Sequence, residues 1–454
     1  MDREPDADAG VAAWGADMHA LVRELYPICR SITGDGVRRT LARLAREIPL
    51  VVHEVPTGTP VFDWTVPREW NIRDACVKDS RGNRVIDFRR HNLHVVGYSV
   101  PVHRTMRLAE LRPHLHTLPD QPDLIPYRTS YYRESWGFCL PHAQLQALPD
   151  DDYEVRIDAT LADGHLTYGE CVLPGAMRDE VLVSCHTCHP SLADDNLSGL
   201  AVATFLARRL AARPRRLTYR FVFAPGTIGA LTWLARNREA TAAIRHGLVL
   251  TCVGDGADLT YKQSRRGDAA VDRAVRHVLE HAGRPFAVVP FTPYGYDERQ
   301  YGSPGFDLPV GCLMRGRHGE FPQYHTSADD PGFVQPGQLA NTLDTLLSVC
   351  DVLENDVAYR NLSPMGEPQL GKRGLYGAVG GTAPKQLELA LLWVLNLSDG
   401  RATLLDVARR SALPFPAVLE AARLLLRHGL LAAPEGPPPD QNARTDLRQW
   451  KASA

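Results

Sequence analysis

Strands and helices alternate through the middle of the chain, and this alternation limits the possible folds more than any other feature. The expected strands are residues 180–185, 217–225, 246–254 and 308–314, and the expected helices are residues 198–213, 227–236, 269–282 and 337–353. Alternation of this kind predicts a mainly parallel sheet with helices on both faces. We therefore predict an α/β fold in which a mixed, mainly parallel sheet is flanked by helices.

The segments on either side of this region have different patterns. Residues 15–47 show the apolar spacing of helices, whereas residues 56–127 are rich in proline and turn signals, which is typical of a small β-rich module. Residues 385–432 fit three helices followed by an apolar tip, as in a winged helix. We expect an α/β domain at 15–55 and 128–360, an inserted module at 56–127, a winged-helix-like domain at 370–437 and a disordered tail at 438–454.

Composition and charge argue against several classes of protein, among them nucleic-acid-binding, membrane-spanning and disulfide-rich proteins. The chain has 454 residues and a net charge of −2, which gives no general electrostatic case for nucleic acid or anionic membranes. No signal peptide and no apolar run of membrane-spanning length is evident, and nine cysteines suit reduced thiols. We expect a cytoplasmic protein. Its winged helix carries little basic excess, so we expect it to contact a protein partner or a second copy rather than DNA.

One short segment allows three kinds of site. Residues 185–189, Cys-His-Thr-Cys-His, match the pattern for covalent c-type haem attachment and also contain a Cys-x-x-Cys pair. Haem attachment normally follows export, for which the chain shows no signal. A redox pair usually opens a helix after a strand, but here Pro190 follows at once. A metal histidine at the end of a strand is the interpretation that we favour.

Three side chains from two loops could hold a catalytic metal. His189 and Asp195 follow the expected strand 180–185, and His325 follows the expected strand 308–314. Ligand sites of parallel sheets lie beyond the carboxyl ends of the strands, so these loops are expected to meet. Imidazole and carboxylate are ligands for hydrolytic zinc. For either histidine taken alone, a hydrogen-bonded loop residue is the interpretation that we favour.

A further loop supplies polar groups for a substrate. Asp297, Glu298, Arg299 and Tyr301 lie together, close to the expected metal edge. Arg299 could hold a substrate carboxylate with two hydrogen bonds, and Tyr301 could line a pocket. A solvated turn with a surface ion pair would have the same sequence.

The chain resembles a known family. The segments SITGDGVRRTL, EVPTGTPVFDWTVPREWNI, CHPSLADDNLSG, DERQY and YHTS, in this order, are similar to the aminopeptidase-like family DUF4910/DUF2172, which is related to the M28 zinc aminopeptidases. The resemblance implies an M28-like domain with a DUF2172-like inserted module and a winged helix. It implies that His189, in preference to His186, is a metal ligand, that Asp195 bridges metals, and that His325 is the late metal histidine.

The chain also departs from the M28 pattern. Two consecutive glutamates, a general base and a metal ligand, are replaced by Gly226 and Thr227. The third metal aspartate has no acid clearly in register, because only Cys252 and Asp255 lie nearby, and Gln323 stands where the family often has glutamate. Loss of a positioned base typically costs a factor of about 10² to 10⁴ in rate.

The function that we predict is a zinc-dependent aminopeptidase-like hydrolase, with one or two zinc ions, that cleaves an amide bond of a small peptide or aminoacylated metabolite. Glu298 or Glu320 would replace the missing base. Asp297, Arg299, Tyr301 and Tyr324 would contact the substrate beneath the inserted module. The alternative is a catalytically degenerate relative that binds a peptide-like ligand or partner without cleaving it.

Overall fold

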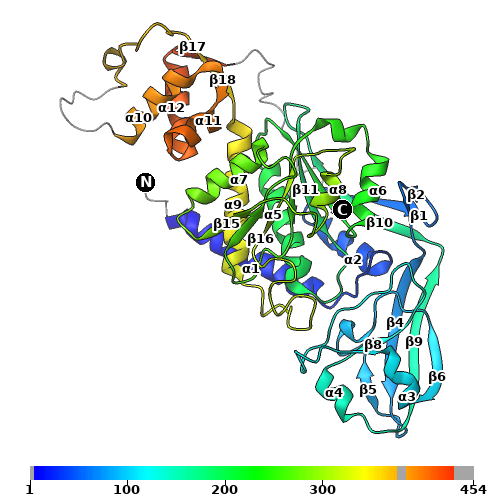
Figure 1. Cartoon of the computed structure of the whole chain (residues 1–454). Coiled ribbons are helices and arrows are strands. Elements are labelled where there is room, and N and C mark those ends of the chain that lie inside the picture. The colour runs from blue at the N-terminus through cyan, green and yellow to red at the C-terminus, as the bar shows by residue number, and fades with distance from the viewer. Residues whose placement is uncertain (1–4, 376–384, 434–454) are drawn as a thin grey trace.

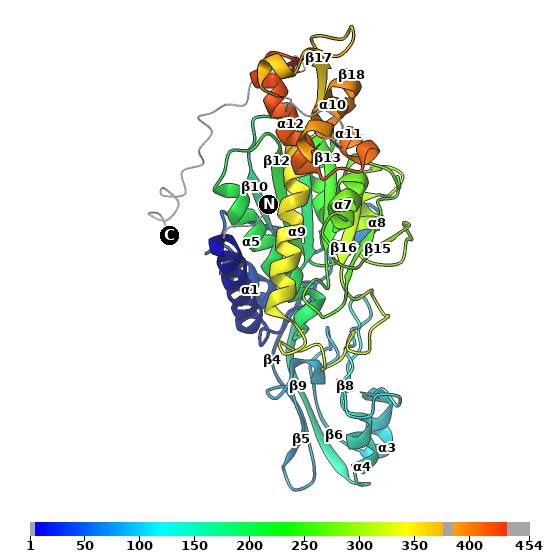
Figure 2. The same ribbon diagram turned by 90° about the vertical axis from the view of Figure 1, so that its left-hand side faces the viewer.

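The computed structural model describes residues 5–375 and 385–433 (Figure 1). A large sheet with helices on both faces forms the centre of the molecule, a second sheet extends from one end, and a small helical domain covers the other end (Figures 1 and 2).

The central sheet has eight strands in the order β1-β10-β12-β11-β13-β16-β14-β15. Their bounds are Val51–Pro56 (β1), His165–Leu173 (β10), Thr218–Ala224 (β12), Glu180–His186 (β11), Ile244–Leu250 (β13), Val310–Met314 (β16), Leu259–Lys262 (β14) and Phe286–Val289 (β15). The four middle strands β12, β11, β13 and β16 are parallel, as the sequence predicts. Strands β1, β10 and β14 introduce antiparallel pairs, so the sheet is mixed.

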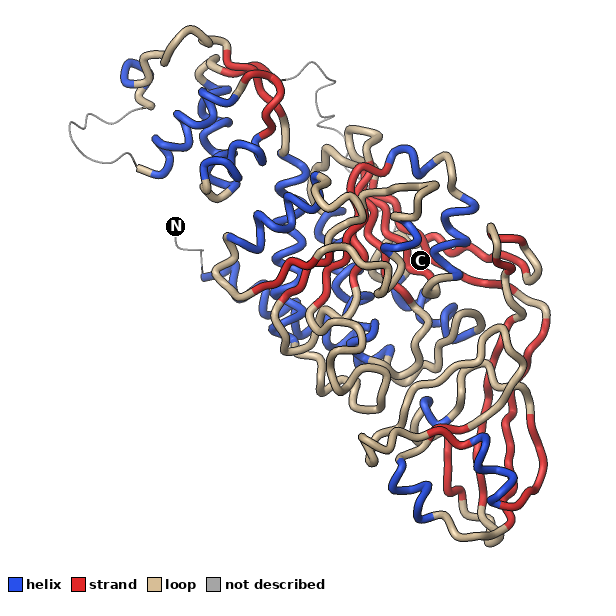
Figure 3. Tube along the Cα trace, in the orientation of Figure 1, coloured by secondary structure: helices blue, strands red, loops and turns tan. Residues whose placement is uncertain are grey.

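Helices cover both faces of this sheet (Figure 3). One face carries α1 (Pro5–Leu25), α2 (Asp35–Leu44), α5 (Gly199–Ala211), α7 (Ala270–Glu280) and α9 (Pro336–Asn355), and the other carries α6 (Ile228–Arg236) and α8 (Glu298–Tyr301). All seven residues of β11 are buried, because this strand lies between helices on both sides. The α/β fold class predicted from the sequence is confirmed.

The second sheet has the strand order β5-β4-β9-β6. Its strands are β4 (Glu69–Lys78), β5 (Arg84–Asp87), β6 (Val102–Arg107) and β9 (Asp152–Ala162), with helices α3 (Leu108–Leu111) and α4 (His142–Ala147) beside them. Strand β9 lies beyond residue 127, where the sequence places the end of the inserted module. It belongs here because it pairs along its length with β4, in antiparallel register from Glu69↔Ala162 to Lys78↔Glu154.

Small paired strands complete the connections between these two regions. The hairpin β2 (Pro60–Val61) and β3 (Trp64–Thr65) and the parallel pair β7 (Leu115–His116) and β8 (Phe138–Cys139) are separate from the two larger sheets.

The C-terminal domain combines three helices with a small sheet. Its elements are β17 (Ala358–Asn361), α10 (Gln386–Leu397), β18 (Asp399–Thr403), α11 (Leu404–Ser411), α12 (Phe415–Arg427) and β19 (Leu431–Ala432), with the strand order β18-β17-β19. It packs on α7, where the amide of Phe415 donates a hydrogen bond of 3.1 Å to Nε2 of His277. The predicted tail at 438–454 lies outside the described residues.

Within the described ranges, no helix combines the length and apolarity needed to cross a membrane.

Candidate metal centre

The candidate site lies beyond the ends of two strands of the central sheet, β11 and β16. Strand β11 ends at His186, and the chain then runs through His189 into an irregular helical turn, Ala193–Ser198, that carries Asp195. Strand β16 ends at Met314, and the following loop brings His325 to the same place. This is the carboxyl edge of the parallel strands, where the sequence predicts a ligand site.

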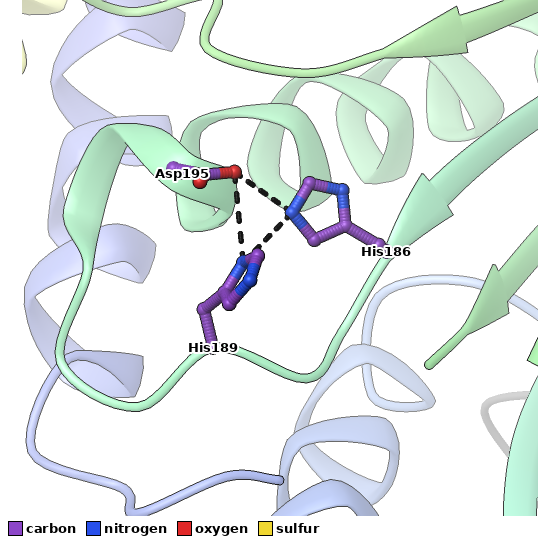
Figure 4. A group of neighbouring side chains, drawn as sticks. All are labelled: His186, His189 and Asp195. Carbon is purple, nitrogen blue, oxygen red and sulfur yellow. Dashed lines mark hydrogen bonds and ion pairs between the residues drawn. The ribbon is translucent and has the colours of Figure 1, made fainter. Parts of the chain in front are cut away.

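Three histidine side chains surround the carboxylate of Asp195: His186 and His189, which Figure 4 shows, and His325 from a distant loop. Nε2 of His186 lies 2.8 Å from Oδ1 of Asp195 and 3.0 Å from Nδ1 of His189. The Nδ1 atom of His189 is 3.6 Å from the same oxygen, and Nε2 of His325 is 3.0 Å from Oδ2. Donor atoms of a tetrahedral zinc site are about 3.3 Å apart, because each lies ~2.0 Å from the metal. The spacing of His186, His189 and Asp195 fits such a site.

The loop that carries Asp195 is fixed from beneath by a second carboxylate. Oδ1 of Asp329 accepts hydrogen bonds from the amides of Ala193 and Asp194, and Oδ2 accepts one from the amide of Asp195. Burial raises the pKa of Asp329 to about 7, although these amide donors favour its charged form. On the other side of the cluster, Nε of the buried Arg30 donates a 3.0 Å hydrogen bond to the carbonyl of His189. The candidate metal donors are therefore held by contacts that do not depend on a ligand.

Burial sets the charges of the cluster. It lowers the pKa of His186 to about 3, because a buried imidazolium is costly, and it also lowers the pKa of His325. Burial alone would raise the pKa of Asp195, but His189 and His186 outweigh it and hold that pKa well below its usual value. Neutral imidazoles beside an ionised carboxylate are the protonation states that bind zinc.

Aromatic rings form the walls of the site. Tyr127 packs edge-on against His189 and His325, at ring distances of 5.1 and 5.0 Å, and its amide donates a hydrogen bond to the carbonyl of His325. Tyr324 stacks on His325, and Tyr296 stacks on His186. The side chain of His325 is 33% exposed while those of His186 and Asp195 are fully buried, so the site opens towards solvent on the His325 side.

The recorded hydrogen bonds and ion pairs of the two acids predicted in the 295–301 loop, Asp297 and Glu298, are to groups other than the clustered histidines. The carboxylate of Glu298 is fully buried, forms an ion pair with Lys262 and accepts hydrogen bonds from the amide of Tyr296 at 3.1 and 3.2 Å. Oδ1 of Asp297 accepts a 2.8 Å hydrogen bond from the amide of Thr227, and burial raises the pKa of Asp297 to about 7. Both carboxylates hold loops of the protein together.

The remaining residues that the sequence predicts to contact substrate, and Glu320, which it predicts as a possible base, differ in burial and contacts. Tyr301 is buried, with its hydroxyl 2.9 Å from that of Ser184, and Arg299 donates a hydrogen bond to the carbonyl of Pro293. The Glu320 side chain is 64% exposed and pairs with Arg317. Tyr324, through its stacking on His325, lies beside the candidate metal donors.

His186, Tyr127 and His318 lie at the candidate site, although the sequence favours His189 over His186 and predicts no role for Tyr127 or His318. The signal for His186 was available, because it is the last residue of a buried strand and therefore lies at the carboxyl edge of the sheet. Tyr127 comes from a distant loop, and only its pairing with the His325 loop brings it to the site. His318 is buried beside Tyr296 and Tyr324, in a loop that carries no motif.

The cysteines next to these histidines are structural in character. The Cys185 thiol donates to the carbonyl of Gly199, and Sγ of Cys188 accepts a hydrogen bond from the amide of Gly226. Burial raises the pKa of both thiols, to about 11 for Cys188. Reactive thiols instead have a lowered pKa in an electropositive setting, so this arrangement does not favour a redox pair.

Known sequences match this chain over most of its length. The profile of the family described as a domain of unknown function, DUF4910, matches residues 19–356, and that of a winged helix-turn-helix matches residues 357–433. A Clostridium acetobutylicum protein, named as a polysaccharide biosynthesis protein with an aminopeptidase-like domain, is 51% identical over 418 residues. The match covers 92% of this chain and 96% of that protein.

Solved structures agree with this relationship. A crystal structure from Clostridium acetobutylicum, described as that of a peptidase, gives a TM-score of 0.90 at 50% identity and covers 94% of this chain and 98% of that one. The zinc aminopeptidase BSAP from Bacillus subtilis gives a TM-score of 0.55 at 13% identity, covering 75% and 94%, and this likeness concerns the fold alone. The chain belongs to the DUF4910 family, and its α/β domain has an aminopeptidase-like fold.

Proposed function

We propose that the protein is a zinc-dependent hydrolase that cleaves an amide bond of a small peptide or an aminoacylated metabolite. The observation that carries the proposal is the convergence of His186, His189 and His325 on the two oxygens of Asp195. Three buried or half-buried imidazoles around one ionised carboxylate form a donor set that suits zinc. The aminopeptidase-like fold supports the same class of reaction.

The residues that would hold the ion can be named from their contacts. His186, His189 and Oδ1 of Asp195 would hold one ion, while Oδ2 of Asp195 and His325 offer donors to a second. A bound zinc ion polarises a carbonyl group and lowers the pKa of a water molecule.

The protein's own residues would prepare this site in three ways. Asp329 and Arg30 hold the loop that carries the donors, so little ordering is needed when an ion binds. Tyr127 and Tyr324 would flank a substrate that enters past the half-exposed His325. A substrate carbonyl at this position would be surrounded by aromatic rings, which exclude water and strengthen polar interactions.

The C-terminal domain favours a protein contact over DNA. The first turn of α12 is docked on the α/β domain through the hydrogen bond between Phe415 and His277. The exposed Arg423 of the same helix contacts Asn355 of α9. We propose that this domain contacts protein, while a second copy of the chain as partner and a cytoplasmic location stay predictions.

A second candidate function is binding without cleavage. The observation in its favour is that residue 226 is glycine, so no acid projects from the position where the M28 pattern has its general base. The metal donors would then capture a carbonyl-containing peptide without turning it over.

Turnover separates these two functions. The zinc-loaded protein should be offered a panel of chromogenic aminoacyl and N-acyl amides, together with a His189→Ala variant loaded in the same way. Hydrolysis that is lost in the variant would support the hydrolase. Zinc-dependent binding of the same amides without product formation would reject it in favour of the binding protein.

A further inference from the structure

The glycine at position 226 faces the ring of Tyr296. A Cβ atom added at Gly226 would lie 2.5 Å from Cζ and 2.7 Å from Cε1 of Tyr296, and closer still to its hydroxyl. Real Cβ atoms essentially never approach other atoms to less than 3.0 Å. The φ angle of Gly226 is outside the left-handed range, so the conflict is with the tyrosine and not with the backbone.

Tyr296 has little freedom to move away from this contact. Its ring stacks on the ring of His186, with ring centres 3.7 Å apart. It also stacks on the ring of His318, with ring centres 6.0 Å apart. Its amide is bound by the carboxylate of Glu298, which is itself held by the buried Lys262. The residue is therefore fixed through both its ring and its backbone.

The hydroxyl of Tyr296 retains hydrogen-bonding capacity. The partner that the structure records for it is Sγ of Cys188, at 3.5 Å, and sulfur is a weak acceptor. The ring that carries this hydroxyl stacks on one candidate zinc ligand, His186, and forms a T-shaped pair with another, His189, with ring centres 6.1 Å apart.

We propose that Tyr296 occupies the space of the acidic side chain expected at position 226, and that its hydroxyl donates a hydrogen bond to the carbonyl oxygen of a substrate held by the metal donors. The second part rests on the proposed function. Preorganised donors of this kind stabilise negative charge that develops on a carbonyl oxygen. The proposal implies that Gly226→Glu does not restore a base, because the glutamate has no room beside Tyr296.

The claim that Tyr296 fills the space of a side chain at position 226 can be tested without any ligand. We expect Gly226→Ala to lower the melting temperature of the otherwise unchanged protein by at least ~3 °C, and to have a much smaller effect in a Tyr296→Ala background. Equal effects of Gly226→Ala in both backgrounds would overturn the claim that these two residues compete for one space.

The role of the hydroxyl is tested with acetohydroxamate, a small carbonyl-containing zinc ligand, titrated by calorimetry into zinc-loaded protein. Tyr296→Phe should keep the zinc content and weaken acetohydroxamate binding about threefold to tenfold, the range of one net hydrogen bond. The control is Tyr294→Phe, which alters an exposed tyrosine of the same loop and should change nothing. Unchanged affinity in Tyr296→Phe would refute the hydrogen bond.

These experiments also distinguish a failure of the proposed zinc-dependent function from a failure of the proposal about Tyr296. If the unaltered protein takes up no zinc, the proposed function is wrong and the role of the hydroxyl fails with it. The melting-temperature comparison still decides whether Tyr296 replaces a side chain at position 226.

Discussion

The two sides of the candidate site differ in what they retain. The histidine side, made of His186, His189, Asp195 and His325, brings every donor within 3.6 Å of another. The glycine side, made of Gly226, Thr227 and Tyr296, has an aromatic ring where an acidic side chain is expected. The difference teaches that a cluster of candidate metal donors can be present where the acid expected as the general base is absent.

The two sides also differ in how they are supported. On the histidine side, a carboxylate and an arginine bind backbone groups of the loop that carries the donors. On the glycine side, the ion pair between Glu298 and Lys262 fixes the backbone of Tyr296. This contrast assigns Glu298 to the support of the loop, whereas the sequence suggests it as a proton carrier.

The largest expected effect comes from breaking this ion pair. Glu298→Gln leaves Lys262 buried without a counter-charge, and loss of one partner of a buried pair costs about 3–5 kcal/mol in the free energy of unfolding. Denaturant titration of the variant measures this loss. A Glu298→Gln/Lys262→Met double variant should recover much of the stability, because no unpaired charge remains.

If Glu298→Gln is as stable as the unaltered protein but loses turnover, Glu298 is a proton carrier after all. The distinction between the two sides would then be wrong on this point.

A smaller effect is expected from pH. The pKa of Asp297 is about 7 in the folded protein and about 3.9 when unfolded, so the folded protein binds the extra proton between these values. Stability is therefore highest below pH 4 as far as this group is concerned, and it falls as pH rises towards 7. Asp297→Asn should remove a loss on the order of 2–4 kcal/mol between pH 4 and 8, measured by denaturant titration at each pH.

The pH profile of Asp297→Asn is compared with those of the unaltered protein and of a control variant, Asp268→Asn. Asp268 is three-quarters exposed, so Asp268→Asn should follow the pH profile of the unaltered protein. A profile of Asp297→Asn that also matches the unaltered protein would show that Asp297 does not titrate in this range.

The smallest effect is expected at Glu320. Its exposed ion pair with Arg317, at 3.7 Å, should contribute less than about 0.5 kcal/mol, so Glu320→Gln should leave the free energy of unfolding unchanged. We also expect zinc uptake to be unchanged. Loss of amide turnover in this stable variant would identify Glu320 as the proton carrier. The general base would then be an exposed side chain at the protein surface.

Much of the fold could be predicted from local patterns. The buried run at β11 and the apolar spacing of α5, α7 and α9 identify strand and helices, because each element buries a face that its sequence displays. The short strands β14 and β15 were missed, because four residues each are too few for a periodic pattern. Strand β9 was also missed as part of the second sheet, because its partner β4 lies far away in the chain.

The candidate site likewise combines residues that local sequence patterns reveal with residues that only contacts between distant segments bring together. His189, Asp195 and His325 stand in recognisable segments at strand ends, so the sequence could propose them. The positions of Tyr127, Tyr296 and His318 depend on contacts between loops that no local pattern records. For the same reason, Gly226 reads in the sequence as a lost base, whereas the structure shows the ring that faces it.

We propose above that Asp195 and the surrounding histidines hold zinc. The most direct test is the zinc content per chain, determined by elemental analysis of protein purified without chelator and then equilibrated with zinc. We predict one or two equivalents in the unaltered protein and a loss of bound zinc in both His189→Ala and Asp195→Ala, with Glu320→Gln as the matched control that keeps it. Absence of zinc from the unaltered protein, or equal zinc in all four proteins, would contradict the account.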